Sequence, residues 1–428
     1  MRLCSLPAAS VLAANVLLMA ACHCGGGGSA VDAGHDLRAD VRAPRPDTVS
    51  PDRGPDLVDP TYCGGSRKRE PVLLKRPRVS GPAPTCLLPN CKRLTFNQFS
   101  TAFEVKGDVL VVSALEPGEV HYVDLKTGKE WLVRKETGLP GCQYLDTDGE
   151  VIAYACGAVY PGWPTPGFAE AISLYDPRTR YETDLSCFSL WWTTSDPCQP
   201  NNLALGTTGV VVNMSLGKCR NQDAFFVSRR GGKLRNLSRV GGGVHGAHLS
   251  GSKVVWHQAA RYAYQIMLYD LDTGKKRLLA PNPKHDQWDP RIVGDMVVWT
   301  DHRNAPGSYF APGNTDIYGH DLSTGKTFAI STHPARQHRP DVDGDWVVWN
   351  DWRHNPGTMT PPDNGLVQKN VDVYAKNLKT GQELQVTSYK KHDSFPKIDG
   401  GRVFFIRTLD VWMVSLPGAS ESAEGTKP

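Results

Sequence analysis

The sequence predicts an all-β chain folded as a seven-bladed β-propeller of four-stranded antiparallel blades, closed by an N-terminal strand that completes the last blade. Three observations predict this fold. A unit of about fifty residues recurs along the chain. Each unit holds four short β-rich segments separated by Gly and Asp turns, without helical periodicity between them. A further strand pattern ahead of the first unit matches the outer strand that the last unit lacks.

The repeat is clearest in the C-terminal half. The segment 290–299, PRIVGDMVVW, recurs fifty residues later at 340–349 as PDVDGDWVVW and more loosely from Pro396. An earlier copy, 248–256, lacks the Pro. A second element of the form Asp-[Ile/Val]-Tyr followed by Leu-x-Thr-Gly comes after the first, at 316–325 and 372–381. An all-β repeat of this length is typical of a propeller blade.

The spacing of the repeats sets the blade count. We expect the seven blades to start near residues 97, 136, 187, 240, 281, 332 and 388. The last blade supplies three strands before the polar tail at Gly418. The segment 92–95, KRLT, is similar to the fourth strands at 385–387 and 328–331. An N-terminal strand in the last blade would remove the two open edges of the ring.

The combined motif is Pro-x-[Ile/Val]-x-Gly-Asp-x-Val-Val-Trp-x-Asp-x-Arg, then Asp-[Ile/Val]-Tyr-x-x-[Asp/Asn]-Leu-x-Thr-Gly, and it resembles the TolB-like propeller repeat. The resemblance covers residues 281–387 well, and 97–280 and 388–416 at lower fidelity. That family includes periplasmic scaffolds, cell-surface proteins and propellers attached to peptidases or lyases, so the resemblance implies a fold rather than an activity. Because the last blade ends close to the end of the sequence, we expect no fused peptidase or hydrolase domain.

Several repeat residues have structural explanations. We expect the tryptophans that end inner strands to pack between blades: Trp256, Trp299 and Trp349. We also expect Arg303 and Arg353, each two residues beyond an Asp, to bond the Asp of the next strand, Asp316 or Asp372.

The N-terminus predicts export. Residues 1–21 form a signal peptide, because the apolar run from Ser10 to Ala21 is too short to cross a bilayer. The sequence LMAAC at 18–22 resembles a bacterial lipobox and predicts lipidation of Cys22. Ordinary secretion with cleavage nearby is the alternative. His23 follows in place of the Asp that resembles an inner-membrane retention signal, which favours the outer membrane, with the domain periplasmic or at the cell surface.

The remaining chain divides by composition. Residues 22–60 are rich in Gly, Ala, Pro and Asp and form a disordered tether. Residues 61–96 form a lead-in segment that includes the closing strand, 97–418 the propeller, and 419–428 a disordered tail. The net charge of +4 is too small and too dispersed to indicate a nucleic-acid partner. We expect a monomer that meets the membrane through its lipid anchor alone.

Cysteine usage predicts disulfides. Beyond Cys4, Cys22 and Cys24, the eight others form an even set in an exported chain. Cys86 with Cys91 and Cys142 with Cys156 are expected local pairs, and two more bonds of unknown order would join Cys63, Cys187, Cys198 and Cys219. Zinc is the competing interpretation, but no CxxC pair is present and the spacings are irregular.

A candidate site lies at the channel mouth, where the loops between blades and the loops joining the second and third strands meet. These loops carry the candidate ligand-binding residues His245, Gln287, Gln337, His338, His392, Asp393, Trp163 and Tyr309. Aromatic, amide and hydroxyl groups suit a sugar or a peptide. Converging imidazoles could instead hold a divalent metal, with candidates His245, Gln287, His338 and His392. Solvated loops on a protein-binding surface are the third interpretation.

The sequence contains no Gly-x-Ser-x-Gly elbow, His-Glu-x-x-His motif or phosphate loop, so no catalytic residue is assigned and no cofactor is expected. We therefore interpret the chain as a binding or scaffold module for an envelope protein or polysaccharide. The alternative is a metal-dependent, lyase-like, carbohydrate-active enzyme. Oligogalacturonate lyase is the precedent within the family for a seven-bladed propeller that uses His and Gln, although its ligand motif is not reproduced here.

Overall fold

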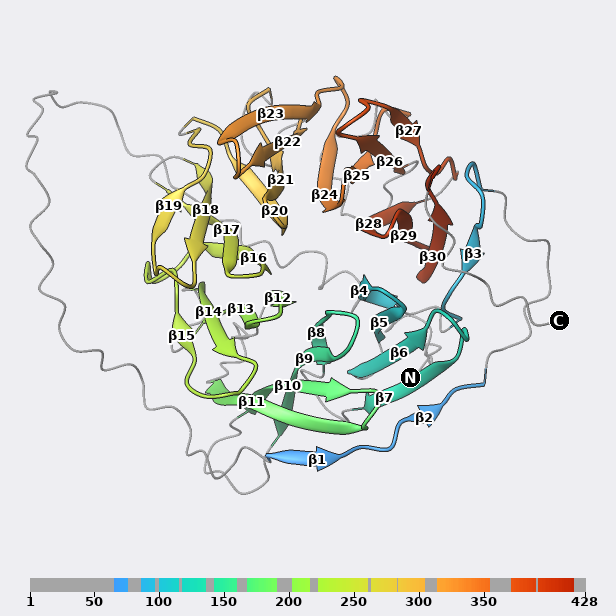
Figure 1. Ribbon diagram of the computed structural model, residues 1–428, viewed down its shortest axis with the longest axis vertical. Coiled ribbons are helices and arrows are strands. Elements are labelled where there is room, and N and C mark those ends of the chain that lie inside the picture. The colour runs from blue at the N-terminus through green and yellow to red at the C-terminus, as the bar shows by residue number, and fades with distance from the viewer. Residues whose placement is uncertain are drawn as a thin grey trace, which may run out of the picture.

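The computed structural model describes thirteen segments of the chain, and they form a ring of seven antiparallel sheets (Figure 1). The segments are 65–75, 86–96, 100–114, 118–135, 142–159, 168–190, 202–215, 222–260, 263–282, 284–304, 314–354, 371–389 and 392–418. All elements in them are strands, which confirms the predicted all-β propeller. The described part of the chain holds no helix that is long and apolar enough to cross a membrane.

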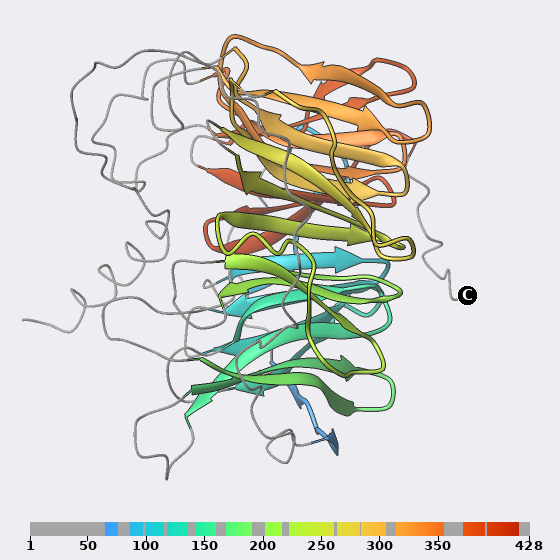
Figure 2. The same ribbon diagram turned by 90° about the vertical axis from the view of Figure 1, so that its left-hand side faces the viewer.

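Each blade runs outward from an innermost strand beside the central channel, and the strands cross the thickness of the ring (Figure 2). Blades one and two are β4 (Ser100–Lys106), β5 (Val109–Ala114), β6 (Glu119–Asp124), β7 (Glu130–Lys135); then β8 (Cys142–Thr147), β9 (Ile152–Val159), β10 (Phe168–Asp176), β11 (Tyr181–Leu190). Blades three and four are β12 (Asn202–Leu205), β13 (Gly209–Ser215), β14 (Gln222–Ser228), β15 (Arg235–Asn236); then β16 (Val244–Ser250), β17 (Lys253–Ala259), β18 (Tyr264–Asp270), β19 (Lys276–Leu278).

The last three blades contain the best-matched copies of the repeat. Blade five is β20 (Gln287–Val293), β21 (Met296–Asp301), β22 (Asp316–Asp321), β23 (Lys326–Ser331). Blade six is β24 (Gln337–Asp343), β25 (Trp346–Asp351), β26 (Asp372–Asn377), β27 (Glu383–Gln385). Blade seven has three strands of its own, β28 (Asp393–Asp399), β29 (Arg402–Arg407) and β30 (Asp410–Ser415).

The fourth strand of blade seven is β3 (Lys92–Arg93), which pairs antiparallel with β30. This confirms the predicted closure of the ring. Thr95 Oγ1 accepts a hydrogen bond from the Val411 N–H (3.0 Å) and donates to Asp410 (3.0 Å). Blade six has the same contact just beyond its own outer strand, where Thr387 Oγ1 accepts a hydrogen bond from the Val373 N–H (2.9 Å). The closing strand therefore reproduces the chemistry of an ordinary fourth strand.

Two further N-terminal strands lie outside the ring and were not predicted. Strand β1 (Ser66–Lys68) pairs with β11 of blade two, and β2 (Val72–Leu73) pairs with β7 of blade one, so both sheets have five strands. Arg67, Arg69 and Arg134 all bind the carboxylate of Glu182, which is fully buried. Together β1, β2 and β3 form a belt along the outside of blades two, one and seven (Figure 1).

The third blade is the one whose predicted start is wrong. Residue 187 lies in β11, the outer part of the long β10–β11 hairpin of blade two, and blade three begins at β12 with Asn202. The alternating pattern near 187 reflects this extended hairpin rather than a new blade. The other six innermost strands begin three to six residues after the predicted blade starts.

The hydrophobic core lies between blades, as predicted for the repeat tryptophans. Trp256, Trp299 and Trp349 are fully buried, and each packs against residues of the preceding blade. The indole N–H of Trp299 donates to Asp301 (2.9 Å), and that of Trp349 donates to Asp351 (2.9 Å). A buried indole with a satisfied N–H fixes the spacing of neighbouring blades.

The strand-end arginines make different partners from those predicted. Arg303 binds Asp301 of its own strand through two N–H groups, at 2.8 and 2.7 Å, and Arg353 binds Asp351 in the same way. The expected partner Asp316 instead accepts from Asn304 (2.6 Å). The prediction is wrong because an arginine two residues beyond the Asp folds back over its own strand, where its guanidinium also covers a tyrosine ring.

Two of the predicted disulfides are confirmed, Cys86–Cys91 and Cys142–Cys156. The first closes a short loop that packs on the core between blades six and seven, directly ahead of β3. The second joins the neighbouring strands β8 and β9 of blade two. Cys63, Cys198, Cys219 and the side chain of Cys187 lie outside the described residues, as do the signal peptide, Cys22, the tether and the tail.

Ring closure can be tested at Asp410, which accepts from both Arg93 (2.5 Å) and Thr95. Replacing Asp410 by Ala removes two hydrogen bonds to a buried carboxylate, and each such bond contributes about 1.5–3 kcal/mol when charged. We expect a lower unfolding temperature and faster amide exchange in β3 and β30, measured by hydrogen exchange with mass spectrometry. The exposed Asp272→Ala is the control, and equal exchange in the two variants would show that β3 does not depend on this carboxylate.

Candidate functional site

The centre of the propeller holds one side chain from the same position of almost every innermost strand. This position lies three residues before the glycine of the first turn in six blades. It is occupied by Glu104, Asp146, His248, Arg291, Asp341 and Lys397, which we name the channel ring; Ala204 stands at the position in blade three. Six of the seven blades therefore contribute an ionisable group to one layer.

Contacts within the channel ring cross between blades. Lys397 Nζ of blade seven lies 2.5 Å from Glu104 Oε1 of blade one. Arg291 of blade five lies 3.9 Å from the same oxygen, although blades five and one are not neighbours in the ring. The side chains thus meet in the middle of the molecule and neutralise one another there.

The channel ring also joins each blade to the next. The Leu205 N–H donates to Asp146 (2.6 Å), and the Ile398 N–H donates to Asp341 (3.0 Å). The Ile292 N–H faces His248 Nδ1 at 3.4 Å. In each case a side chain of one innermost strand accepts from the backbone of the following innermost strand. Such contacts fix the register between blades.

Burial and neighbouring charges perturb the titration of the channel ring. Burial, with the Glu104 carboxylate beside it, raises the pKa of Asp146 to about 8. Burial and then Arg291 and Lys397 lower the pKa of His248 well below its usual value. Burial would lower the pKa of Arg291, but Glu104 and Asp341 outweigh it and raise that pKa. At neutral pH the ring therefore holds a neutral imidazole and a largely protonated Asp146.

Nearer the channel mouth, the innermost strands of blades five, six and seven carry a β-bulge. The third residue of each strand, Asp289, Arg339 or Phe395, has a positive φ of 51°, 55° or 57° and precedes a proline. We name these three the bulge residues. Blade four has Gly246 at the corresponding place. A left-handed conformation costs little for glycine but about 1–3 kcal/mol for other residues, and such strain gathers at functional sites.

Hydrogen bonds from the preceding blade hold each bulge in place. The N–H groups of the bulge residues donate to the side chains that follow the repeat Trp. Their lengths are 3.4 Å from Asp289 to His257 Nδ1, 3.2 Å from Arg339 to Thr300 Oγ1 and 3.2 Å from Phe395 to Asn350 Oδ1. The hydrogen bonds between blades therefore hold the strained backbone of each bulge in place and set the direction of the bulge side chain.

The bulge side chains are partly or largely exposed, whereas most of the residues next to them on the same strands are buried. Phe395 is 40% exposed, Asp289 has 38% of its side chain exposed, and Arg339 is also exposed. The guanidinium of Arg339 lies 4.1 Å from the centre of the Phe395 ring. This stack joins blades six and seven and orients the arginine.

An aromatic cluster lies beside the bulges, between blades four and five. Trp288 packs against Tyr264 (4.3 Å between ring centres) and His257 (4.7 Å). His245 extends the cluster, 5.5 Å from His257. His245 is partly exposed, whereas His257 and Trp288 are buried.

The predicted site residues fall into two groups. Gln287, Gln337 and Asp393 are fully buried at the start of their strands. Gln287 donates to the Ala280 carbonyl (2.9 Å) and Asp393 forms two short bonds with Arg407, at 2.7 and 2.6 Å. Gln337 donates to the carbonyl of Ala335 in the loop before its strand, so all three side chains are used in hydrogen bonds within the fold.

The predicted histidines are spread over three blades. His245 lies in the aromatic cluster of blade four. His338 is 5% exposed and its Nε2 lies 3.5 Å from Asp289 Oδ2, and burial lowers its pKa well below the usual value. His392 is partly exposed beside blade seven, and burial lowers its pKa. Trp163 and Tyr309 lie outside the described residues.

The four metal candidates come from four different blades, four to seven. Among the described residues, no three His, Cys, Asp or Glu side chains form a group that could hold a metal ion. Gln287, moreover, uses its amide N for Ala280 and its amide O to accept from the Ile266 N–H (3.3 Å). The three histidines among the four candidates do not form such a group.

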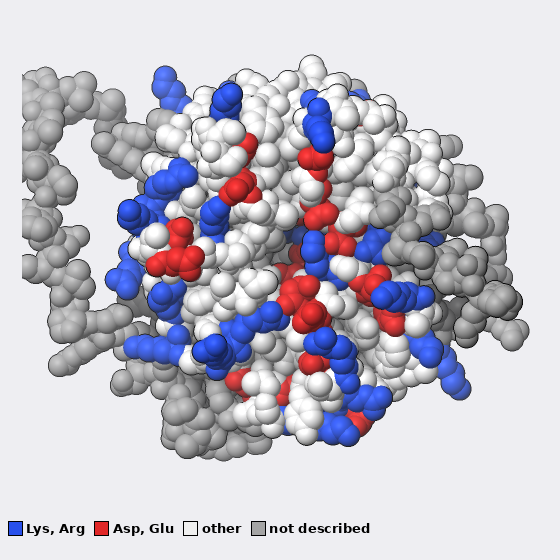
Figure 3. Space-filling model, viewed as in Figure 1, with Lys and Arg blue, Asp and Glu red and all other residues white. Residues whose placement is uncertain are grey.

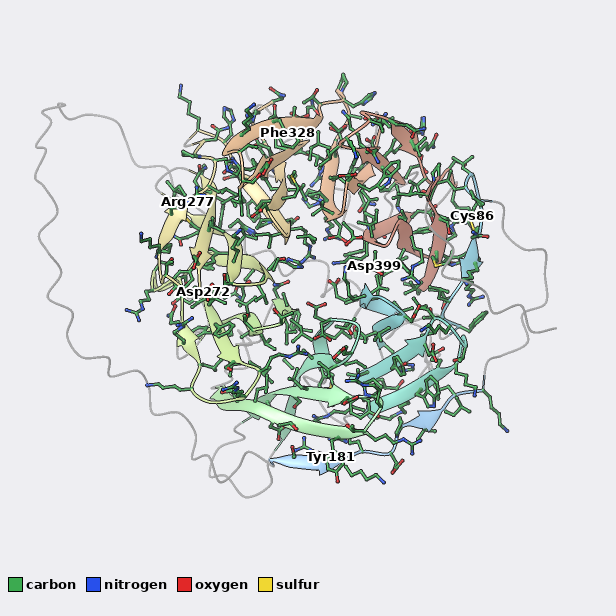
Figure 4. The ribbon with its side chains drawn as sticks, viewed as in Figure 1. Cys86, Tyr181, Asp272, Arg277, Phe328 and Asp399 are labelled. Carbon is green, nitrogen blue, oxygen red and sulfur yellow. A yellow bond between two sulfur atoms is a disulfide. The ribbon has the colours of Figure 1, made fainter. Side chains whose placement is uncertain are left out.

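The face opposite the mouth is formed by the first and third turns of the blades. Acidic side chains run through the middle of this face, while Lys and Arg are frequent over the edge formed by blades three and four (Figure 3). Asp399 lies toward the centre of the ring, and Asp272 and Arg277 lie on the periphery (Figure 4). Lys106 bridges Asp399 (2.8 Å) and Asp343 (3.1 Å), which links blades one, six and seven. This face is therefore largely internally paired near the channel.

Sequence reasoning missed both the channel ring and the bulge residues, although signals for them were present. A proline inside a strand pattern marks an edge or a bulge, and here it follows each bulge residue directly. The ring residue is the variable position of the Pro-x-[Ile/Val] motif. Its identity changes from blade to blade, so a search for repeated residues passes over it.

Comparison with solved structures supports the fold. An oligogalacturonate lyase in complex with manganese matches with a TM-score of 0.52 and 13% identity, over 83% of this chain and 98% of that chain. The oligogalacturonate lyase of Vibrio parahaemolyticus gives 0.53 and 11%, over 83% and 99%. A protein provisionally assigned as TolB from Agrobacterium tumefaciens gives 0.40 and 11%, over 70% and 98%.

No protein-family profile and no curated protein matches the sequence. At 11–13% identity the structural matches show the fold alone. The chain is a seven-bladed β-propeller, of the architecture that its TolB-like repeat implied.

The raised pKa of Asp146 gives a pH-dependent stability. In the unfolded chain a free Asp titrates near pH ~4, whereas in the folded chain this carboxyl titrates at about 8. Between these values the unfolded state releases the proton and the native state keeps it, so this group lowers stability as pH rises from about 4 to 8. Asp146→Asn should flatten the fall in unfolding temperature across this window, measured by scanning calorimetry.

The matched control is Asp272→Asn, which changes an exposed turn residue. It should keep the pH dependence of the wild-type protein. If Asp146→Asn showed the same pH dependence as the wild type, the Asp146 carboxyl would have an ordinary pKa in the channel.

Proposed function

We propose that this protein is an exported binding module whose propeller holds a ligand of the cell envelope, a polysaccharide or a protein, at the channel mouth. The observation that carries the proposal is the set of bulge residues. Three neighbouring blades hold an acidic, a basic and an aromatic side chain in strained backbone conformations at the same level of the mouth. Strain that is fixed by the surrounding packing, and that exposes polar and aromatic groups, is typical of ligand sites.

The distribution of the other polar groups supports binding rather than catalysis. The channel ring is paired across blades, and Gln287 and Asp393 are used in structural hydrogen bonds. The groups that remain available to a ligand are the bulge residues, which form the rim of the mouth, and the aromatic cluster next to them. A rim of this kind provides directional hydrogen bonds and stacking surface, which suit a sugar chain or a peptide segment.

We favour a polysaccharide as the first ligand class to test. Two solved structures with TM-scores above 0.5 are named as oligogalacturonate lyases, so proteins of this architecture can act on an oligosaccharide. Export and anchoring through Cys22 belong to the same proposal and are supported by the N-terminal sequence. Replacing Cys22 by Ser should move the protein from the membrane fraction to the soluble fraction of cells, and unchanged partitioning would contradict lipidation.

The binding face can be tested without disturbing the backbone. Asp289→Gly, Arg339→Gly and Phe395→Gly together remove the bulge side chains, and glycine accepts the positive φ at each position. We expect retention of radiolabelled envelope polysaccharide to fall at least tenfold, while the unfolding temperature stays equal or rises. A control triple variant away from the mouth, Asp272→Gly, Arg277→Gly and Asp345→Gly, should bind as the wild type does. Equal retention by both triple variants would place the ligand elsewhere.

The fold likeness to a lyase in complex with manganese supports one alternative, a metal-dependent carbohydrate-active enzyme with His245, Gln287, His338 and His392 at the mouth. Elemental mass spectrometry of the purified chain separates the two functions. The binding-module proposal expects no stoichiometric metal. Stoichiometric manganese or zinc that is lost in both His245→Ala and His338→Ala would overturn it and justify a polysaccharide cleavage screen.

A further inference from the structure

Many arginines of this propeller pair with carboxylates, whereas Arg339 stacks on an aromatic ring at the mouth. Arg291 faces Glu104 in the channel ring, and the strand-end arginines Arg303 and Arg353 bind Asp301 and Asp351. Within the described residues, no hydrogen bond or ion pair involves the Arg339 guanidinium, whose contact is the ring of Phe395 at 4.1 Å. Its N–H donors are therefore available to a ligand at the mouth.

The position of Arg339 is built rather than accidental. Its backbone is held at a φ of 55° by the hydrogen bond from its N–H to Thr300 of blade five. Its guanidinium is held from the other side by Phe395, itself at a φ of 57° and bonded to Asn350. Contacts from three blades thus set one exposed cation at the mouth. A guanidinium stacked on an aromatic ring keeps its hydrogen-bonding edge open.

The surroundings of Arg339 favour an anionic partner. Burial lowers the pKa of His338 most; Asp289 opposes this, and Arg336 and Arg339 lie close enough to lower the pKa further. His338 itself is buried and has a pKa well below its usual value, so it adds no charge at neutral pH. Two cations and one carboxylate therefore lie near His338. A planar guanidinium binds a carboxylate through two parallel N–H···O bonds.

We infer that Arg339, stacked on Phe395 at the rim between blades six and seven, is a subsite for a carboxylate group of the bound ligand. The inference rests on the proposed binding role of the mouth and adds its charge requirement. A uronic acid of a polysaccharide is the source that the proposed function favours, and an acidic side chain of a protein is the other. Asp289, one blade away and partly exposed, is placed to accept hydrogen bonds from hydroxyl groups of the same ligand.

The test uses the full mature chain and two matched pairs of probes. The first pair is an oligoglucuronate and its neutral methyl ester, and the second is an oligoglutamate peptide and its glutamine counterpart. Isothermal titration calorimetry should detect the oligoglucuronate and show at least tenfold weaker binding of its ester. Arg339→Gln should weaken oligoglucuronate binding by about ten- to a hundredfold, the range for a lost hydrogen bond to a charged group, and should leave the ester unaffected.

Two variants separate the charge from its geometry. Arg339→Lys keeps the positive charge but lacks the two parallel N–H groups of the guanidinium. It should therefore bind oligoglucuronate more tightly than Arg339→Gln and less tightly than the wild type. Phe395→Leu keeps an apolar side chain without the aromatic face and should weaken binding by less than Arg339→Gln does. Arg277→Gln, which removes an exposed arginine of β19, should change nothing. Circular dichroism and unfolding temperatures confirm that every variant is folded.

The outcomes distinguish the subsite from the proposed function. Binding of the peptide pair in place of the sugar pair would keep the carboxylate subsite and assign its ligand to protein. If Arg339→Gln retained envelope polysaccharide as well as the wild type while the triple glycine variant lost it, the binding face would stand and the subsite would be wrong. If neither acidic probe bound the wild type at millimolar concentration, the carboxylate subsite would be overturned.

Discussion

The structure depends on one recurring contact, in which a backbone N–H of one innermost strand is bonded by a side chain from the blade before it. Asp146, His248 and Asp341 make this contact at the level of the channel ring. His257, Thr300 and Asn350 make it again at the level of the bulges. Propeller blades are separate sheets, so these bonds add directional contacts to the hydrophobic packing between neighbouring blades. Together the two rows set the relative height of blades two and three and of blades four to seven.

This arrangement links the stability of the ring to the geometry of the mouth. The residue after the repeat Trp holds the bulge of the next blade, while the Trp itself fills the space between the two blades. The position of an exposed side chain such as Arg339 is therefore set by buried groups in a neighbouring blade. Precision at the mouth comes from the packing of the core, because the strained conformations persist only where the surroundings determine them.

Much of the fold could be predicted because the repeat exposes it in sequence. The Val-Val-Trp strand, the Thr-Gly turn and the closing segment KRLT are each visible as copies of one pattern, and the structure confirms them. The start of blade three was missed because β10 and β11 are longer than the other strands and shift the pattern. The partners of Arg303 and Arg353 were missed because sequence spacing does not say whether a side chain folds back or reaches across.

The site was harder to predict than the fold for a physical reason. Three predicted site residues are polar enough to bind a ligand: Gln287, Gln337 and Asp393. In the structure they are fully buried and form hydrogen bonds within the fold instead. The residues that do face the mouth are brought there by a bulge, which reverses the alternation expected along a strand. One extra residue before each proline therefore shifts the alternation of the strand. The bulge side chain becomes exposed at the mouth, and most of the side chains before it become buried.

The N-terminal belt has a mechanical consequence. Its strands lie on blade two, then blade one, then blade seven, so the chain crosses the seam of the ring before it enters the first blade. A force applied at the N-terminal side acts first on β1, where Arg67 and Arg69 bind Glu182. It acts on the closing strand β3 last. The strands β1 and β2 would therefore detach before the closing strand β3 came under force, and the ring would stay closed until then.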